Sequence, residues 1–298
     1  MMAAISSQAL RGDLRDNEPL ARHTTWRVGG PARRFYRPAD APDLAHFLSQ
    51  LPEDEPLLWL GLGSNLLVRD GGFDGTVIAL AGSLSAIEIE GEHLRLGAGA
   101  ACAKVAREAA RAGLTGAAFL AGIPGTMGGA LAMNAGAFGG ETWERVESVQ
   151  TVDRGGRLRM RTPDEFVISY RHVECPAEEW FVACTLKLER GDAEQEQAAI
   201  RALLDRRGAT QPTGRPSGGS TFRNPQGDYA ARLIEDCGLK GYRIGGAEVS
   251  EKHANFVLNA GHASAADIEQ LIDYMRAQVQ RQHGICLQAE VHVVGVAK

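Results

Sequence analysis

The chain has 298 residues, a length that allows about two domains, and its 32 basic and 37 acidic residues give a net charge of −5. This charge argues against a general nucleic-acid binder, because no domain-wide basic field is available to displace counterions. The hydrophobic share of 44% and the charged share of 23% are typical of a soluble globular enzyme.

Residues 1–18 are predicted to form a polar lead-in, and they lack the basic region and apolar core of a secretory signal. No apolar run approaches the roughly 18–20 residues of a membrane helix. The cysteines form no CxxC pair and have no spacing for zinc or an iron–sulfur cluster, so no metal site is expected. We expect buried or inert thiols in a reducing cytoplasm. The five are Cys102, Cys175, Cys184, Cys237 and Cys286.

Between about Thr24 and Glu189, short apolar segments alternate with glycine-containing turns. Such segments predict strands over 57–60, 76–80, 86–90 and 181–188. Apolar residues at helical spacing predict helices over 40–51 and 101–111. After Asp192, a polar helix is predicted to end near Arg207-Gly208.

The predicted polar helix carries Ile200, Leu203 and Leu204 on one face, and the turn-rich segment 211–219 that follows predicts irregular structure. Ser264 begins a capping-box-like start of a further helix, which Gly284 ends. Its apolar face consists of Ile268, Leu271, Ile272, Met275 and Val279. A last strand is predicted over Leu287–Val294. Strands and helices mix without regular βαβ alternation, so the predicted fold class is α+β.

A first glycine-rich segment, LGLGSNLL over 60–67, follows a predicted strand. Gly61 and Gly63 would let successive backbone N–H groups turn inward and hold an anion. The segment is not a Walker loop, because no Gly-Lys-Ser/Thr follows. It also lacks the dinucleotide fingerprint, because Leu66 stands where the third glycine belongs. A tight turn without a ligand is an equally good interpretation of this segment alone.

A second segment, 122–140, concentrates glycine and alanine in the run GIPGTMGGALAMNAGAFGG. Each glycine weakens a helix by about 1 kcal/mol relative to alanine, so a packing role explains the run poorly. Side-chain-free positions let backbone N–H groups approach a flat or charged ligand, such as a pyrophosphate. Two such loops indicate a cofactor with a diphosphate, and close packing of a helix on a sheet is the alternative.

Together with TTWRVGGPA at 24–32, these segments resemble the FAD-binding half of the UDP-N-acetylenolpyruvoylglucosamine reductase family, which belongs to the vanillyl-alcohol oxidase-type flavoproteins. Further motifs follow in the family's order from about Leu20 to Gly295. These are SYR at 169–171, SGGSTFRNP at 217–225, LIE at 233–235, GLKG at 238–241, VSEKHANF at 249–256 and EV at 290–291. The short interval between Arg171 and Ser220 favours the type II form of the family. Val173 stands where the family often has serine, so a change in contacts near Arg171 is expected.

The resemblance implies an FAD-binding domain over 19–190, in two subdomains split near residue 80, and a substrate-binding α+β domain over 191–298. It implies noncovalent FAD, NADPH as hydride source and a UDP-sugar substrate. The implied function is reduction of UDP-N-acetylglucosamine enolpyruvate in peptidoglycan synthesis. The residues expected to contact the cofactor are Arg27, Gly61, Gly63, Ser64, Asn65, Leu66, Gly122, Ile123, Gly125, Thr126, Gly128, Gly129, Asn134, Ala135 and Gly136.

Hydride addition to the enol ether of this substrate places negative charge beside its carboxylate. The resemblance assigns Arg171 to the carboxylate, which a guanidinium grips with two parallel hydrogen bonds. It assigns Ser220 as proton donor and Glu290 as an acid held near the anionic species. Without the resemblance, these residues would be a surface ion pair, a turn serine and a solvated strand glutamate.

The residues expected to contact the substrate are Tyr170, Arg215, Arg223, Asn224, Lys240, Lys252 and His253. No nucleic-acid or membrane partner is expected, and the predicted state is a cytoplasmic monomer or weak homo-oligomer. Two other functions stay open: another FAD oxidoreductase of the superfamily, such as a sugar or lactone oxidase, and a nucleotide-sugar-binding protein without turnover.

Overall fold

The computed structural model describes residues 10–176 and 178–298, and the chain divides into two compact units. Unit 1 comprises the described residues up to Arg15, together with Phe35–Gly61 and Thr76–Arg206. Unit 2 comprises Asp16–Arg34, Leu62–Gly75 and Arg207–Lys298. Neither unit is one continuous stretch of chain, so residues far apart in the sequence build each core.

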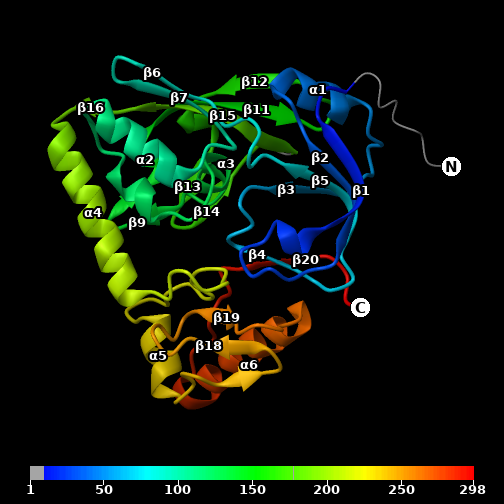
Figure 1. Ribbon diagram of the computed structural model, residues 1–298, viewed down its shortest axis with the longest axis vertical. Helices are drawn as coiled ribbons and strands as arrows, with labels where there is room; N and C mark the ends of the chain where they lie inside the picture. Colours follow the sequence, from blue (N-terminus) through cyan, green and yellow to red (C-terminus); the bar gives the residue numbers. More distant parts are fainter. Residues whose placement is uncertain (1–9, 177) are drawn as a thin grey trace. The chain divides into compact units, whose positions relative to one another are not determined.

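Unit 1 is organised around an antiparallel sheet of five strands in the order β12-β11-β15-β7-β6. The strands are β6 Ile87–Glu90, β7 His93–Gly97, β11 Val146–Asp153, β12 Leu158–Arg161 and β15 Glu179–Lys187. Helices α2 (Cys102–Arg111) and α3 (Met127–Ala132) cover one face of it (Figure 1). Val105 and Ala109 of α2, Leu131 of α3, and Leu94 and Leu96 of β7 belong to the same buried core.

A smaller cluster in unit 1 surrounds α1, which spans Ala41–Ser49 and begins where the side chain of Asp40 accepts a hydrogen bond from the Asp43 backbone N–H at 2.9 Å. Leu44 and Phe47 of α1 are fully buried, and Phe47 stacks on Tyr36 with ring centroids 3.9 Å apart. Strands β1 (Asp13–Pro19), β2 (Pro31–Arg37), β5 (Phe73–Ala79) and β3 (Leu57–Leu60) form a four-stranded sheet. Part of the expected lead-in therefore forms β1, and residues 1–9 lie outside the described residues.

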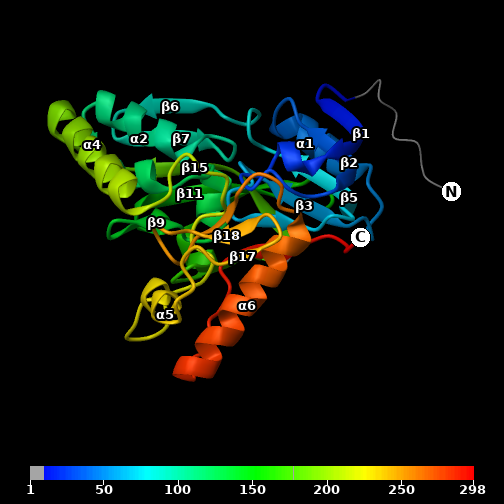
Figure 2. The ribbon, with the colours of Figure 1, turned by 60° about the horizontal axis from the view of Figure 1, so that its bottom comes forward.

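Unit 2 pairs α6 (Ala265–His283) with a three-stranded antiparallel sheet of β17 (Arg243–Ile244), β18 (Ala247–Val249) and β19 (Val257–Asn259), as Figure 2 shows. Ser264 and Asp267 form the predicted capping box, and Gly284 ends α6 with a φ of 70°. All five residues of its predicted apolar face are buried, so this prediction is confirmed. Helix α5 (Ala230–Asp236) adds Leu233 and Ile234 to the same core.

The C-terminal strand is shorter than predicted. The predicted strand Leu287–Val294 is wrong over its first half, because only β20 (His292–Val294) is a strand, paired in parallel with β4 (Leu66–Val68). Residues 288–290 instead pair with the segment that follows Ser220, through the bridge between Ala289 and Phe222. Glu290 therefore lies between the residues that pair with the segment after Ser220 and those that pair with β4, and not in the middle of a strand.

Two helices also differ from the sequence-based expectation. Part of the glycine-rich segment 122–140 forms α3, because Ala130, Leu131 and Met127 offer an apolar face that outweighs the weak propensity of the two glycines. Helix α4 spans Ala193–Thr210, past the predicted end near residue 208. Of the three residues on its predicted face, Ile200 is buried, Leu203 is half-buried and Leu204 is exposed.

The remaining strands are β8 Leu114–Thr115, β9 Gly136–Ala137, β10 Gly140–Glu141, β13 Val167–Ser169, β14 His172–Glu174 and β16 Glu189–Arg190. The 3-10 helices are η1 Leu20–Arg22, η2 Ala118–Gly122, η3 Thr142–Arg145 and η4 Pro163–Glu165. Over the described ranges, no helix has the length and apolar character needed to cross a membrane.

Candidate active site

Gly61, near the start of the first glycine-rich segment, lies against the second segment inside unit 1. Gly61 follows β3, and a Cβ added there would lie 2.5 Å from Thr126 Oγ1. Thr126 is almost fully buried and immediately precedes α3. A side chain at residue 61 would therefore displace the start of the second segment, and glycine lets the two loops lie in direct contact.

Gly128 and Gly129, both in the first turn of α3, have different surroundings. A Cβ on Gly128 would lie 3.0 Å from the Cβ and 3.1 Å from the carbonyl oxygen of Ala98. A Cβ on Gly129 would meet nothing closer than Thr126 Oγ1 at 3.9 Å, and this residue is exposed. Gly128 is thus explained by packing on the sheet, whereas the bare backbone at Gly129 fits a cradle for a flat or charged ligand.

Asn134 holds the second segment in place. It is buried with a φ of 40°, and its Nδ2 donates to Glu141 Oε2 at 2.7 Å and to the Ser169 carbonyl at 3.2 Å. Its Oδ1 accepts a hydrogen bond from the Trp143 N–H at 3.2 Å. Because these three bonds go to protein groups, a contact between Asn134 and a cofactor would come from its backbone.

Other predicted cofactor residues of unit 1 take part in local packing. A Cβ on Gly122 would lie 2.6 Å from the Phe138 ring, and one on Gly136 would lie 2.6 Å from the Gly140 carbonyl. The Gly125 carbonyl accepts from the Cys102 N–H at 3.0 Å, and Ile123 is buried. Ala135 accepts two hydrogen bonds from Thr142, at 3.1 Å from its N–H and 2.6 Å from its Oγ1.

Arg171 lies in the turn between β13 and β14 with a φ of 56°, a conformation that costs a side-chain-bearing residue about 1 kcal/mol. Its Nη2 donates to the Gly136 carbonyl at 2.8 Å, and its guanidinium carbon lies 5.5 Å from the centre of the exposed Tyr170 ring. This hydrogen bond places the guanidinium beside the second glycine-rich segment. Val173 packs against the core of unit 1, which explains an apolar residue at that position.

Residues 63–66 and Arg27 lie in unit 2. Gly63 has a φ of 61°, and a Cβ there would lie 2.2 Å from the His23 carbonyl, so only glycine fits. Ser64 and Asn65 are half-buried, and Leu66 begins β4. Arg27 is exposed with a φ of 59°. These residues therefore share a compact unit with the C-terminal part of the chain.

Ser220 and Glu290 are brought together in unit 2 by pairing of the backbones beside them. The Glu290 N–H donates to the Thr221 carbonyl at 2.8 Å, and the Arg223 N–H donates to the Gln288 carbonyl at 2.9 Å. Both side chains are half-buried, which leaves them accessible to a ligand. Arg171 belongs to unit 1.

Lys240 and His253 form a second polar group in unit 2. Lys240 Nζ donates to Glu235 Oε1 at 2.6 Å. Burial lowers the pKa of His253, and the neighbouring Lys240 charge lowers it further. The His253 ring packs edge-on against Phe256 with centroids 4.9 Å apart. His253 is therefore mainly neutral near pH 7 and suits hydrogen bonding more than binding of a negative charge.

The other predicted substrate residues already have protein partners. Arg215 lies 3.6 Å from Glu248, a buried carboxylate that also pairs with Arg243 at 2.5 Å. Asn224 Oδ1 accepts from the Ala230 N–H at 3.1 Å, at the start of α5. Lys252 Nζ donates to the Gly208 carbonyl. Arg223 is half-buried.

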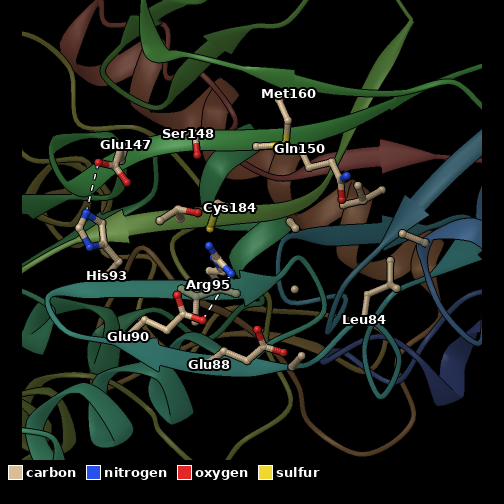
Figure 3. A pocket seen from close by; sticks show the side chains of 17 residues that line it. Leu84, Glu88, Glu90, His93, Arg95, Glu147, Ser148, Gln150, Met160 and Cys184 are labelled. Atoms are coloured by element: carbon tan, nitrogen blue, oxygen red, sulfur yellow. Dashed lines mark hydrogen bonds and ion pairs between the residues drawn. The ribbon is translucent and has the colours of Figure 1, made fainter.

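A separate cavity of about 730 Å³ lies on the face of the five-stranded sheet in unit 1, and no predicted site residue lines it. Four of its side chains form two pairs, His93 with Glu147 at 3.3 Å and Arg95 with Glu90 at 3.4 Å (Figure 3). Its lining residues include neither a residue of the two glycine-rich segments nor Arg171.

The cysteines show no arrangement for chemistry among the residues that the structure covers. Cys102 and Cys184 are buried, Cys175 and Cys237 are half-buried, and Cys286 is exposed. Burial raises the pKa of Cys102 to about 12, which makes its thiol inert at neutral pH. No group of three His, Cys, Asp or Glu side chains in the described ranges could hold a metal ion.

Two family models match the chain. An FAD binding domain covers residues 32–160, and the C-terminal domain of UDP-N-acetylenolpyruvoylglucosamine reductase covers residues 211–294. The first model includes Gly61, Thr126 and Gly129, and the second includes Ser220 and Glu290. The open backbone at Gly129 fits an FAD-binding role.

Similar proteins extend over the whole chain. The UDP-N-acetylenolpyruvoylglucosamine reductase of Alkalilimnicola ehrlichii is 60% identical over 297 residues, covering 100% of both chains. That of Methylococcus capsulatus is 57% identical and covers 99% of this chain and 98% of its own. The crystal structure of the Thermus caldophilus enzyme superposes with a TM-score of 0.82 at 35% identity, covering 95% of this chain and 99% of that one. The predicted α+β fold is confirmed, and the chain belongs to the UDP-N-acetylenolpyruvoylglucosamine reductase family.

Proposed function

We propose that this chain reduces UDP-N-acetylglucosamine enolpyruvate to UDP-N-acetylmuramate with FAD and NADPH, a step of peptidoglycan synthesis. The observation that carries this proposal is the pairing of the backbone beside Ser220 with that beside Glu290, with 2.8 Å between Glu290 N and Thr221 O. It places a hydroxyl and a carboxyl group on adjoining segments of the domain that the reductase family model matches.

We assign residues 19–190 to FAD binding, in two subdomains split near residue 80, residues 191–298 to substrate binding and residues 1–18 to a lead-in. The two family-model matches support this division of labour, because each falls inside one of the assigned ranges. The two compact units have other boundaries than these assigned domains, because segments 16–34 and 62–75 pack with the C-terminal part of the chain. The units are defined by packing, and the assigned domains by the ligand that each would bind.

Bound noncovalent FAD would supply the hydride that the substrate receives. Gly61, Thr126 and Gly129 would form part of its cradle, because Thr126 Oγ1 is the atom nearest to a Cβ on either glycine and Gly129 offers open backbone. Gly63, Ser64, Asn65 and Leu66 would contribute from unit 2 as a glycine turn with inward N–H groups. The other assigned contacts are Arg27, Gly122, Ile123, Gly125, Gly128, Asn134, Ala135 and Gly136.

Three side chains would act on the substrate. The Arg171 guanidinium would hold the carboxylate and oppose the charge that grows beside it. The Ser220 hydroxyl would give a proton to the carbon next to the carboxylate. A hydroxyl is a weak acid, but the carbanion is a strong base and can take a proton from it. The Glu290 carboxyl, kept protonated beside the anionic species, would donate a hydrogen bond to it.

The diphosphate and sugar would be held by the remaining polar residues. Arg215, Arg223, Lys240 and Lys252 offer positive charge, and Tyr170, Asn224 and His253 offer polar contacts. Lys240 and Arg215 would exchange their partners Glu235 and Glu248 for phosphate oxygens. We assign the protein to the cytoplasm as a monomer or weak homo-oligomer, where NADPH and the sugar nucleotide are available.

The test uses the visible absorbance of the flavin in purified protein. Addition of NADPH without oxygen should bleach the flavin, and only the enolpyruvyl sugar nucleotide should restore the colour. Recovery with oxygen alone at a comparable rate would instead indicate an oxidase. A flavin that NADPH does not bleach would contradict the proposed reaction.

A further inference from the structure

Asn255 fixes the backbone directly after Ser220. Its Oδ1 accepts from the Phe222 N–H at 3.0 Å, and its Nδ2 donates to the Phe222 carbonyl at 2.8 Å. Its own carbonyl accepts from the Thr221 N–H at 2.8 Å. Asn255 is only 3% exposed, so water does not compete for these bonds.

The segment that Asn255 holds is also the one that pairs with Glu290. The Thr221 N–H donates to the Asn255 carbonyl, and the Thr221 carbonyl accepts from the Glu290 N–H at 2.8 Å. Phe222 is buried and forms a bridge with Ala289. A shift of residues 221–222 would therefore move the Ser220 hydroxyl and the Glu290 carboxyl relative to each other.

Asn255 itself sits at the bend that leads into β19, and the Phe256 N–H that follows donates to the His253 carbonyl at 3.0 Å. The amide is suited to this place because one planar group offers an acceptor to the N–H and a donor to the carbonyl of the same residue, Phe222. Aspartate offers no donor when ionised, and an aliphatic residue offers neither group.

We infer that Asn255 is a positioning residue for the proposed reduction, which holds Ser220 and Glu290 in register for proton delivery without touching the substrate. This inference rests on the proposed function, because it acts through the role assigned to Ser220. Catalysis needs the hydroxyl within a few tenths of an ångström of its productive place, and a shift of about 1 Å can cost about 10²-fold in rate.

The test compares the two flavin half-reactions in the flavin-loaded Asn255→Ala variant. Reoxidation by the enolpyruvyl sugar nucleotide should slow by about tenfold to a hundredfold, because the proton donor is displaced. Reduction by NADPH should stay within about twofold, because that step needs no proton from Ser220. Amide hydrogen exchange should quicken in peptides covering 220–223 and 288–291 and stay unchanged over 270–280.

Ser264→Ala is the matched control. It removes a side-chain hydrogen bond in the same unit, from the Asp267 N–H to Ser264 Oγ at 3.0 Å, and it does not touch residues 220–223 or 288–290. This variant should be less stable and still reoxidise at the parental rate. If Asn255→Ala yields no flavin-loaded protein, Asn255→Asp, which keeps the volume and the bond from the Phe222 N–H, takes its place with the same expected split.

A double substitution shows whether Asn255 acts through Ser220. In a Ser220→Ala background, Asn255→Ala should change reoxidation by no more than about threefold, because the donor that it positions is already absent. Independent, multiplying losses would overturn the inference, as would equal slowing of both half-reactions or parental reoxidation in the single variant. If Ser220→Ala alone reoxidises at the parental rate, the serine's proposed role fails, and the inference fails with it.

Discussion

Asn65 and Glu290 lie 225 positions apart in the sequence, and Asn65 Nδ2 donates a hydrogen bond to the Glu290 carbonyl at 3.0 Å. The His292 N–H returns a bond to the Asn65 carbonyl at 3.1 Å, where β20 begins to pair with β4. The first glycine-rich segment therefore anchors the residue proposed to stabilise the anionic species. One loop would then serve both the cofactor and the substrate.

Asn65→Ala tests this shared role. The variant should lose FAD more readily and also slow flavin reoxidation by substrate, because the Glu290 backbone loses a partner. Loss of one such hydrogen bond costs about 1 kcal/mol of stability. FAD titration by fluorescence and single-turnover absorbance measure the two effects. A change in only one of them would show that the loop serves one ligand.

Glu290→Gln separates the side chain from this backbone contact. The amide keeps the shape and the main-chain bonds, but it cannot supply an acidic proton. Reoxidation by the enolpyruvyl sugar should slow by at least about 10²-fold, with FAD affinity and NADPH reduction near parental values. Equal slowing of both half-reactions would point to a structural role for Glu290.

Purified protein should be yellow and should release its FAD on denaturation, because no residue of the proposed cradle is assigned a covalent bond to it. Heat release followed by fluorescence of the supernatant measures the stoichiometry. The melting temperature should rise with added FAD, since a ligand that binds the native state stabilises it. Colourless protein that takes up no added FAD would contradict the cofactor assignment.

Gly128 and Gly129 should respond differently to substitution although they are neighbours. Gly128→Ala should lower stability by about 1–3 kcal/mol even without FAD, because its Cβ would press on Ala98. Gly129→Ala should stabilise the FAD-free protein by about 0.5–1 kcal/mol, since alanine favours the helix and space is open. Thermal melts without FAD measure both changes in stability.

Gly129→Val should raise the Kd for FAD by at least about tenfold, which FAD titration measures. Unchanged FAD affinity in this variant would leave Gly129 without a ligand role.

Regular periodicity made much of this fold predictable. The apolar face of α6 and its caps at Ser264 and Gly284 follow from local spacing, and all are observed. The helix at Met127–Ala132 was not predictable, because glycine propensity opposes it and burial against the sheet decides it. The pairing partner of residues 288–290 depends on a segment about 70 positions earlier, which alternation along one strand does not reveal.

The sequence predicted which residues form the candidate site, but it did not predict how they are arranged in space. Motif order pointed to Ser220 and Glu290, whereas their adjacency comes from the bond between Thr221 and Glu290. Asn255 was visible within the VSEKHANF motif, but nothing in its spacing indicated that its amide holds Phe222. The local sequence signal is an asparagine between two apolar residues. Such a side chain, if it is buried, must find hydrogen-bond partners.

Ser220→Ala carries the most weight for the mechanism. If the hydroxyl supplies the proton, the variant should bind FAD and accept hydride from NADPH normally, because neither step uses that proton. Reoxidation by substrate should slow by about 10²–10⁴-fold, the usual contribution of general acid catalysis. Stopped-flow absorbance of the flavin measures both steps in one preparation.

Ser220→Cys is the graded companion to that variant. A thiol can still donate a proton, although its size and geometry differ, so its reoxidation rate should lie between those of alanine and the parent. In deuterated water the parent should place one deuterium on the carbon next to the carboxylate, since the hydroxyl exchanges with solvent, whereas the hydride goes to the terminal carbon. Near-parental reoxidation in Ser220→Ala would make Ser220 a turn residue and require another acid. The ordering parent, cysteine, alanine, together with unchanged reduction by NADPH, ties the loss to the proton and not to the fold.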